Sequence, residues 1–145
     1  MRILLAFLAV VIGGCAAVQP PAPVSDPATV FAPPAARSEN VAIAGLLDGA
    51  RADAASGRLA NAAAALERAL RIEPRNPRLW QELARVHLKQ GEYAQAESTA
   101  ARSNSWAGGD STLRAANWRL IAQAREARGD AAGARAALEA AERQR

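Results

Sequence analysis

The stretch Asn61–Tyr93, NAAAALERALRIEPRNPRLWQELARVHLKQGEY, decides the fold. Its apolar residues recur at intervals of three and four, which is the period of one face of an α-helix. Pro74 ends the first helical pattern, because proline lacks a backbone donor and clashes with the preceding turn. Asn76 and Pro77 then offer an N-cap side chain and a favourable first-turn φ for the next helix. The stretch therefore predicts the second helix of one hairpin and the first helix of the next.

The hairpin pattern repeats along the chain. Gly57 and Gly91 lie 34 residues apart, and so do Leu46 and Trp80. A third copy matches the second at a shift of 38, at Trp118, Ile121, Ala122, Gly129 and Ala134. This order of residues resembles tetratricopeptide (TPR) repeats. The resemblance implies an all-α solenoid of tandem helix-turn-helix repeats, about three in number. These repeats would occupy residues 43–76, 77–110 and 115–145.

Polar and glycine residues mark the predicted ends of these helices. Gly57 occupies the position of a left-handed C-cap. The link Ser103–Asp110 contains Gly108-Gly109 and is predicted to be a loop, with Trp106 in it. Asp110 or Ser111 would cap the helix that follows, and Asp130 would cap the last helix. On that last helix, the spacing predicts a packing face of Ala131, Ala134, Leu138 and Ala141.

The N-terminal residues are predicted to be a signal peptide rather than part of the fold. Ile3 to Ile12 is an unbroken apolar run of ten residues, too short to span a hydrocarbon core about 30 Å thick. The run ends in Gly13-Gly14-Cys15, which resembles the lipobox of bacterial lipoproteins. The resemblance implies removal of residues 1–14 and attachment of acyl chains, such as palmitate, to Cys15. The alternative is an ordinary signal peptide that happens to end in cysteine.

Cys15 is the only cysteine, so the chain has no intramolecular disulfide. Ala16, in place of aspartate, follows the cysteine, and in the lipoprotein pattern this implies the periplasmic face of the outer membrane. Six of the eight prolines lie between Pro20 and Pro34. This composition cannot bury enough apolar surface to fold, so residues 15–37 are predicted to be a disordered, lipid-anchored tether. The TPR domain would then occupy residues 38–145.

The inventory of catalytic residues is small, and we expect no enzyme activity, no metal and no cofactor. His87 is the only histidine, and it lies at a repeat position that usually holds a packing side chain. The sequence contains no glycine-rich phosphate loop and no paired metal-ligand motif. Trp80 and Trp118 occupy matching positions and are predicted to pack in the core. Trp106 has no counterpart in the other copies and lies in the predicted loop, so it is a candidate for partner contact; the alternative is that it packs over the helix ends.

The charge distribution indicates a protein partner rather than nucleic acid. From Cys15 onward the chain has 17 Lys and Arg against 14 Asp and Glu, which is only mildly basic. In a TPR array the first helix of each pair lines an inner groove. The residues predicted to point into this groove are Leu47 and Arg51; Arg78, Gln81, Arg85 and Lys89; and Ala116, Arg119 and Gln123.

The second helix of this set carries three cations and an amide on one face, opposite its predicted core face. One interpretation is an ordinary solvated helix surface. The other is a basic groove for an acidic or carboxylate-bearing peptide, since arginine pairs with carboxylates through two parallel hydrogen bonds. The lysine and asparagine clamp of chaperone-binding TPR proteins is not matched, because no asparagine lies at the required groove positions.

Lipobox, tether and short TPR domain together resemble the LpoP-type lipoproteins, through Arg71–Pro77 (RIEPRNP), Ser103-Asn104-Ser105 and Asn117–Ile121 (NWRLI). Such lipoproteins activate bifunctional class A penicillin-binding proteins, which polymerise and crosslink peptidoglycan in cell wall biogenesis. The resemblance implies an enzyme activator that works by protein–protein interaction. Two alternatives remain: a pilotin-like assembly factor for a secretin or type IV pilus, and a generic TPR scaffold of the envelope.

Overall fold

The computed structural model describes residues 34–144, with side chains from Asn40 onward. The predicted signal peptide, the lipidation site Cys15 and the tether as far as Pro33 lie outside the described residues. The described part contains six α-helices and no strand: α2 (Pro34–Ala55), α3 (Leu59–Ile72), α4 (Pro77–Gln90), α5 (Tyr93–Trp106), α6 (Ser111–Ala127) and α7 (Ala131–Glu142). None of these six helices is long and apolar enough to cross a membrane.

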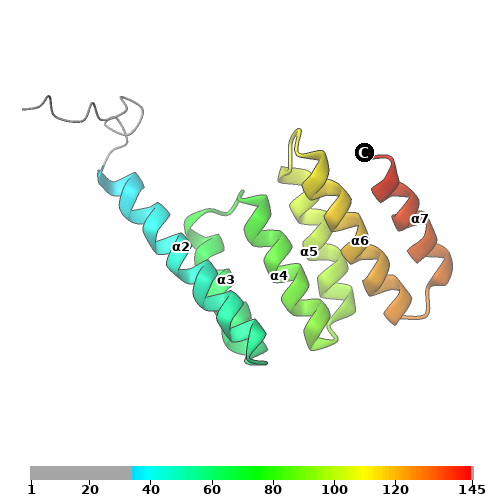
Figure 1. Cartoon of the computed structure of the whole chain (residues 1–145), viewed down its shortest axis with the longest axis horizontal. Helices are drawn as coiled ribbons and strands as arrows, with labels where there is room; N and C mark the ends of the chain where they lie inside the picture. The colour runs from blue at the N-terminus through cyan, green and yellow to red at the C-terminus, as the bar shows by residue number, and fades with distance from the viewer. Residues whose placement is uncertain (1–33, 145) are drawn as a thin grey trace, which may run out of the picture. The chain divides into compact units, whose positions relative to one another are not determined.

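The predicted all-α repeat architecture is confirmed. Each helix packs on the next one in the chain, so that α2 with α3, α4 with α5, and α6 with α7 form three hairpins. The hairpins follow one another in chain order from α2 to α7 (Figure 1). The first helices of the second and third hairpins, α4 and α6, also contact each other directly. This contact brings side chains of consecutive repeats onto one shared surface.

The helix ends follow the predicted capping residues. The Asn76 side chain accepts hydrogen bonds from the backbone N–H groups of Arg78 and Leu79, at 3.0 and 3.4 Å. Asp110 and Asp130 cap α6 and α7 in the same way, with acceptor distances of 2.9 and 2.8 Å. Gly91 ends α4 at φ +79°, in the left-handed region that glycine adopts without strain. The boundaries of the repeats are therefore set by local side-chain and backbone chemistry.

The core between the hairpins is built largely from alanine. Alanines that are at most 1% exposed recur on all six helices and let the helix backbones approach closely: Ala50, Ala62, Ala69, Ala84, Ala96, Ala100, Ala124, Ala137 and Ala141. Larger side chains fill the space between them, chiefly Leu66, Leu79 and Ile121. Trp80 and Trp118 pack against this core while remaining partly exposed, in agreement with their predicted role.

Three boundaries and contacts differ from the predictions. Helix α2 begins at Pro34, four residues before the predicted start of the folded part. Helix α5 continues to Trp106, so Ser103–Trp106 is helical and the loop is only Ala107–Asp110. On α7, Ala134 and Ala141 are buried as predicted, whereas Ala131 is exposed and Leu138 is 49% exposed, because the inward face contains Ala137 and Ala140 instead.

Candidate protein-interaction groove

A hollow of about 290 Å³ is lined by residues of α2 and α4, together with Leu66 of α3. We call it the α2–α4 pocket. Its deep part is apolar, since Ala50, Leu66 and Val86 line it and are each less than 5% exposed. Ala54 and Ala55 of α2 complete the apolar side. The hydrophobic lining would release water when an apolar side chain enters.

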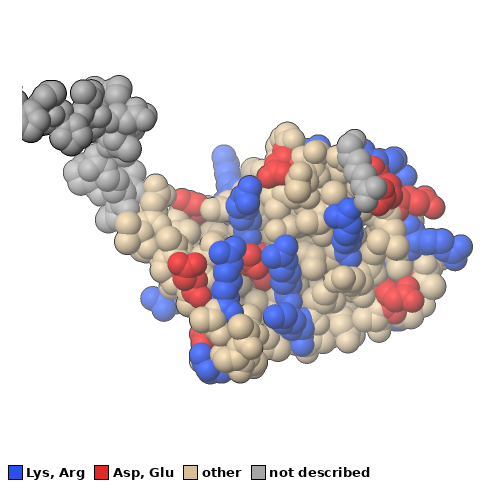
Figure 2. Space-filling model, in the orientation of Figure 1, with Lys and Arg blue, Asp and Glu red and all other residues tan. Residues whose placement is uncertain are grey.

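Charged residues form the rest of the α2–α4 pocket. Arg51, Arg85 and Lys89 are exposed and line it together with Glu82, which is largely buried. Three of the predicted groove cations therefore meet around one concave site. In the view of Figure 2, Lys and Arg side chains gather over α2, α4 and α6, with acidic side chains between some of them. This face of the molecule is therefore basic overall, and acidic side chains neutralise some of its positive charges.

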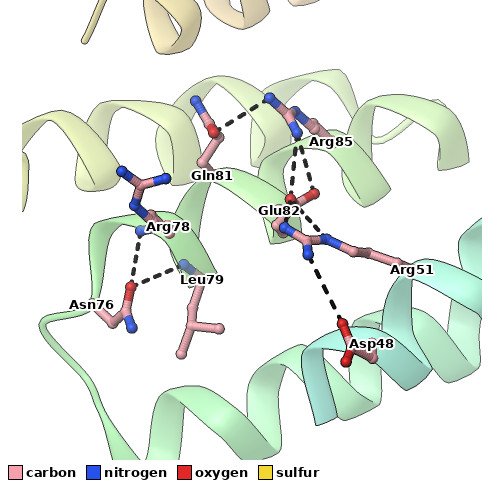
Figure 3. A network of polar contacts seen from close by, with 8 residues as sticks. All are labelled: Asp48, Arg51, Asn76, Arg78, Leu79, Gln81, Glu82 and Arg85. Carbon is pink, nitrogen blue, oxygen red and sulfur yellow. Dashed lines mark hydrogen bonds and ion pairs between the residues drawn. The ribbon is translucent and has the colours of Figure 1, made fainter. Parts of the chain in front are cut away.

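Glu82 links the two helices that form the pocket. Its Oε1 atom accepts from Nη2 of Arg51 at 2.8 Å and from Nε of Arg51 at 3.3 Å. Arg85 approaches the same carboxylate at 3.4 Å, and its Nη2 atom lies 3.3 Å from Oε1 of Gln81. Asp48 contributes a further contact to Arg51 at 4.0 Å (Figure 3). The pocket charges are thus prearranged by a small polar network.

Gln81 differs from its predicted place on the exposed stripe. Its side chain is buried, at 7% exposure, and its Nε2 atom donates to Oδ1 of Asn117 on α6 at 2.9 Å. Asn117 in turn donates to Ser103 Oγ and to Asn104 Oδ1 on α5, at 2.7 and 3.0 Å. The Ser103 hydroxyl donates to the carbonyl of Pro77 at 2.7 Å. Gln81 therefore joins α4 to α6. The periodicity of the α4 sequence could not predict this burial, because the helix that covers Gln81 is α6.

The other predicted groove residues lie in different surroundings. Arg78 is exposed at the start of α4 and pairs with Asp110, the N-cap of α6, at 3.4 Å. Arg119 and Gln123 are exposed on α6, one helical turn apart. Neither has a side-chain hydrogen bond or ion pair among residues 40–144. The structure thus brings Arg51, Arg85 and Lys89 into one pocket and leaves Arg78 outside it.

Trp106 belongs to a second cluster, where the α3–α4 loop meets the end of α5. The Trp106 side chain is 40% exposed, and the guanidinium of Arg75 lies 5.1 Å from its ring centroid. One turn earlier on α5, Arg102 lies 4.9 Å from the ring centroid of Trp80. Both contacts are within the range of cation–π attraction. The lack of a repeat counterpart pointed to Trp106 in the sequence, but the contacts of Arg75 with Trp106 and of Arg102 with Trp80 were not predicted.

The surroundings of His87 indicate a structural role. Its Nδ1 atom lies 2.6 Å from Glu92 Oε2 at the turn between α4 and α5, and its side chain is only 15% exposed. Within the described residues, no three His, Cys, Asp or Glu side chains lie close enough together to hold a metal ion. The residues that line the α2–α4 pocket offer ion pairing through Arg51, Arg85 and Lys89 and apolar contact through the alanines, Leu66 and Val86.

Comparison with known proteins agrees with this architecture. Residues 53–116 match the tetratricopeptide repeat family. No curated protein matches the chain. Among solved structures, the globular C-terminal domain of LpoP from P. aeruginosa is 49% identical, with a TM-score of 0.68. The similarity covers 69% of this chain and 94% of that domain. At this identity over nearly the whole of the related domain, the chain belongs to the LpoP family of tetratricopeptide-repeat proteins.

Proposed function

We propose that this protein is a lipid-anchored periplasmic module that docks on a class A penicillin-binding protein and activates it. The observation that carries the proposal is the 49% identity to the LpoP domain across a shared TPR architecture. LpoP-type lipoproteins, which the sequence resembles, are activators of these peptidoglycan synthases. A fold of stacked helices with a concave, charged face suits a docking role.

The N-terminal segment supports the proposed location of the protein in the cell envelope. Lipid on Cys15 would anchor the protein to the outer membrane, with the domain on the periplasmic side. In an extended polyproline-like state, residues 15–33, which precede helix α2, would span on the order of 60 Å at about 3.1 Å per residue. This reach would let the domain pass through the peptidoglycan layer to a synthase in the inner membrane. Activation would then depend on the distance between the membranes.

The face formed by α2, α4 and α6, which includes the α2–α4 pocket, is the proposed docking surface. Arg51, Arg85 and Lys89 would meet acidic side chains of the synthase, and Arg119 and Gln123 would extend the contact along α6. Arg78, Gln81 and Trp106 complete the predicted set, with Gln81 acting indirectly through Arg85. Docking activates only if the domain binds the active conformation of the synthase more tightly than the inactive one.

Reconstitution with purified components tests this function. A protein of residues 16–145 contains the whole compact unit Pro33–Arg145. Added to a purified class A penicillin-binding protein, it should raise the rate of glycan polymerisation. Changing Arg85, Lys89 and Arg119 to Glu should abolish the effect. The matched control changes Arg68, Arg71 and Arg135, which are exposed and do not line the α2–α4 pocket, to Glu. If the unaltered protein does not change the polymerisation rate, the proposed function is wrong.

A further inference from the structure

The size of the α2–α4 pocket restricts what it holds. At about 290 Å³, it is at the lower limit of cavities that enclose small-molecule ligands, which measure about 300–1,000 Å³. The pocket is also about half open to solvent, so a segment of another protein can place a side chain in it. Its deep lining of Ala50, Leu66 and Val86 offers no hydrogen-bonding side chain. The inserted side chain should therefore be apolar.

The charges at the pocket are not balanced. Arg51, Arg85 and Lys89 face a single carboxylate, Glu82, so the formal charge of the lining is +2. Arg51 holds this carboxylate at 2.8 Å, a normal length for a charge-assisted hydrogen bond. Arg85 reaches it only at 3.4 Å, beyond the usual range of about 2.7–2.9 Å for such bonds. The weaker contact leaves Arg85 available to a second carboxylate.

Lys89 lies one helical turn after Arg85 on α4, on the same face. Its ammonium group has no ion-pair partner among the described side chains. Figure 3 shows Arg85 over Glu82 on α4, with Arg51 reaching the same carboxylate from α2. The pair Arg51–Glu82 thus holds the two walls together, whereas Arg85 and Lys89 present donors beside an apolar hollow.

We propose that the α2–α4 pocket binds an apolar side chain of the partner together with the carboxylate of an adjacent Asp or Glu. The apolar side chain enters beside Ala54 and Val86, and the carboxylate binds Arg85 and Lys89. This inference rests on the proposed function, because the bound segment belongs to the docked synthase. It gives the recognition motif as an acidic residue next to a large aliphatic or aromatic one.

Capped dipeptides test this chemistry without the synthase. N-acetyl-Leu-Asp-amide is titrated into ¹⁵N-labelled protein of residues 16–145, and the backbone amide shifts are followed by NMR. The shifts should localise to residues 50–55 and 82–89. N-acetyl-Leu-Asn-amide and N-acetyl-Ala-Asp-amide should each bind at least about fivefold more weakly, since each loses one of the two interactions. Equal binding of all three peptides, or shifts that do not localise to the pocket, would overturn the inference.

Two variants separate the charged and apolar contributions. Replacing Arg85 and Lys89 with Gln should remove the preference for Asp over Asn and the dependence of binding on salt. Ala54→Leu should fill the hollow and remove the preference for Leu over Ala, with the salt dependence retained. Arg135→Gln, an exposed change on α7, is the control and should bind as the unaltered protein does. Amide spectra of each variant verify that it is folded.

The synthase assay distinguishes this inference from the proposed function. Suppose that the unaltered protein activates the synthase and that the double variant Arg85→Gln, Lys89→Gln activates it equally. The pocket inference is then wrong, and the proposed function stands. If the dipeptides bind as expected but the synthase is not activated, the function is wrong and the chemistry of the pocket stands.

Discussion

Gln81 on α4 and Asn117 on α6 are both buried, and they share a hydrogen bond of 2.9 Å from Nε2 to Oδ1. Asn117 is completely buried and also donates to two side chains of α5. One asparagine therefore joins three helices that belong to two repeats. A buried polar group costs free energy unless it is paired, so the network is favourable only in the correct stacking of these helices.

Asn117→Ala should lower the free energy of unfolding substantially. The change leaves the Gln81 amide without its acceptor and creates a small void between α4, α5 and α6. Each buried polar group that loses its partner costs about 1–3 kcal/mol. Urea unfolding followed by circular dichroism measures the loss. Gln123→Ala, an exposed change on the same helix, is the control and should stay within about 0.5 kcal/mol of the unaltered protein. Equal stability of the two variants would contradict a structural role for the network.

The same network explains why part of the fold was not predictable from the sequence. Ser103, Asn104 and Ser105 are typical of loops, because their side chains compete with helical backbone hydrogen bonds. In the structure, Asn117 binds the first two from a neighbouring helix, and the third bonds to the carbonyl of Arg102 within α5. A tertiary contact therefore outweighs the local preference and extends α5 to Trp106.

Features with a local cause were predictable. The N-caps at Asn76, Asp110 and Asp130 depend on side chains within three residues of the groups that they bind. The repeat itself follows from periodic alanines and from glycines at helix ends. The pocket, in contrast, depends on how far apart α2 and α4 lie in space, and this distance cannot be derived from a spacing in the sequence. The sequence therefore indicated Arg51, Arg85 and Lys89 as groove residues. That these three residues line one pocket together with Glu82 is visible only in the structure.

Two glycine substitutions should change stability in opposite directions. Gly91 has φ +79°, where a Cβ atom is strained by about 1–2 kcal/mol, and an added Cβ would touch no atom closer than 4.0 Å. Gly91→Ala should therefore destabilise the protein through backbone strain alone. Gly49 lies within α2, and a Cβ there would meet nothing within 4 Å. Gly49→Ala should stabilise the protein by about 0.5–1 kcal/mol, because alanine favours the helix.

Thermal unfolding of the two glycine variants, measured side by side, checks this pair. The midpoint should fall for Gly91→Ala and rise for Gly49→Ala. A fall for both would contradict the predicted stabilisation by Gly49→Ala.

Trp80 and Trp106 should respond differently to replacement by phenylalanine. The Trp80 indole donates from Nε1 to the carbonyl of Pro74 at 2.8 Å, which fastens the α3–α4 loop. Trp80→Phe removes this hydrogen bond and should cost about 1 kcal/mol. Trp106 has no such bond among the described residues and is 40% exposed, so Trp106→Phe should have little effect on stability. Chemical denaturation measures the free energy of unfolding of both variants. Equal losses of stability would contradict the prediction.

Glu97 should be the most important surface carboxylate for holding the last two hairpins together. Its Oε1 atom accepts from Nη2 and Nε of Arg125 at 2.6 and 2.8 Å, and its Oε2 atom accepts from Arg128 at 3.2 Å. Arg125 also donates to the carbonyl of Gly133 in α7, at 3.2 Å, so one arginine joins α5, α6 and α7. These Glu97 and Arg125 side chains are only 23% and 29% exposed, which limits screening by solvent.

Glu97→Gln should therefore lower the free energy of unfolding by about 1–2 kcal/mol, since hydrogen bonds to charged groups contribute more than neutral ones. Asp48→Asn provides the control, because Asp48 is 79% exposed and touches Arg51 only at 4.0 Å. Such an exposed pair contributes close to nothing. Hydrogen exchange adds a local measurement: amides of α7 should exchange faster in Glu97→Gln and unchanged in Asp48→Asn. Unchanged protection of α7 in both variants would mean that alanine packing alone fixes the last helix.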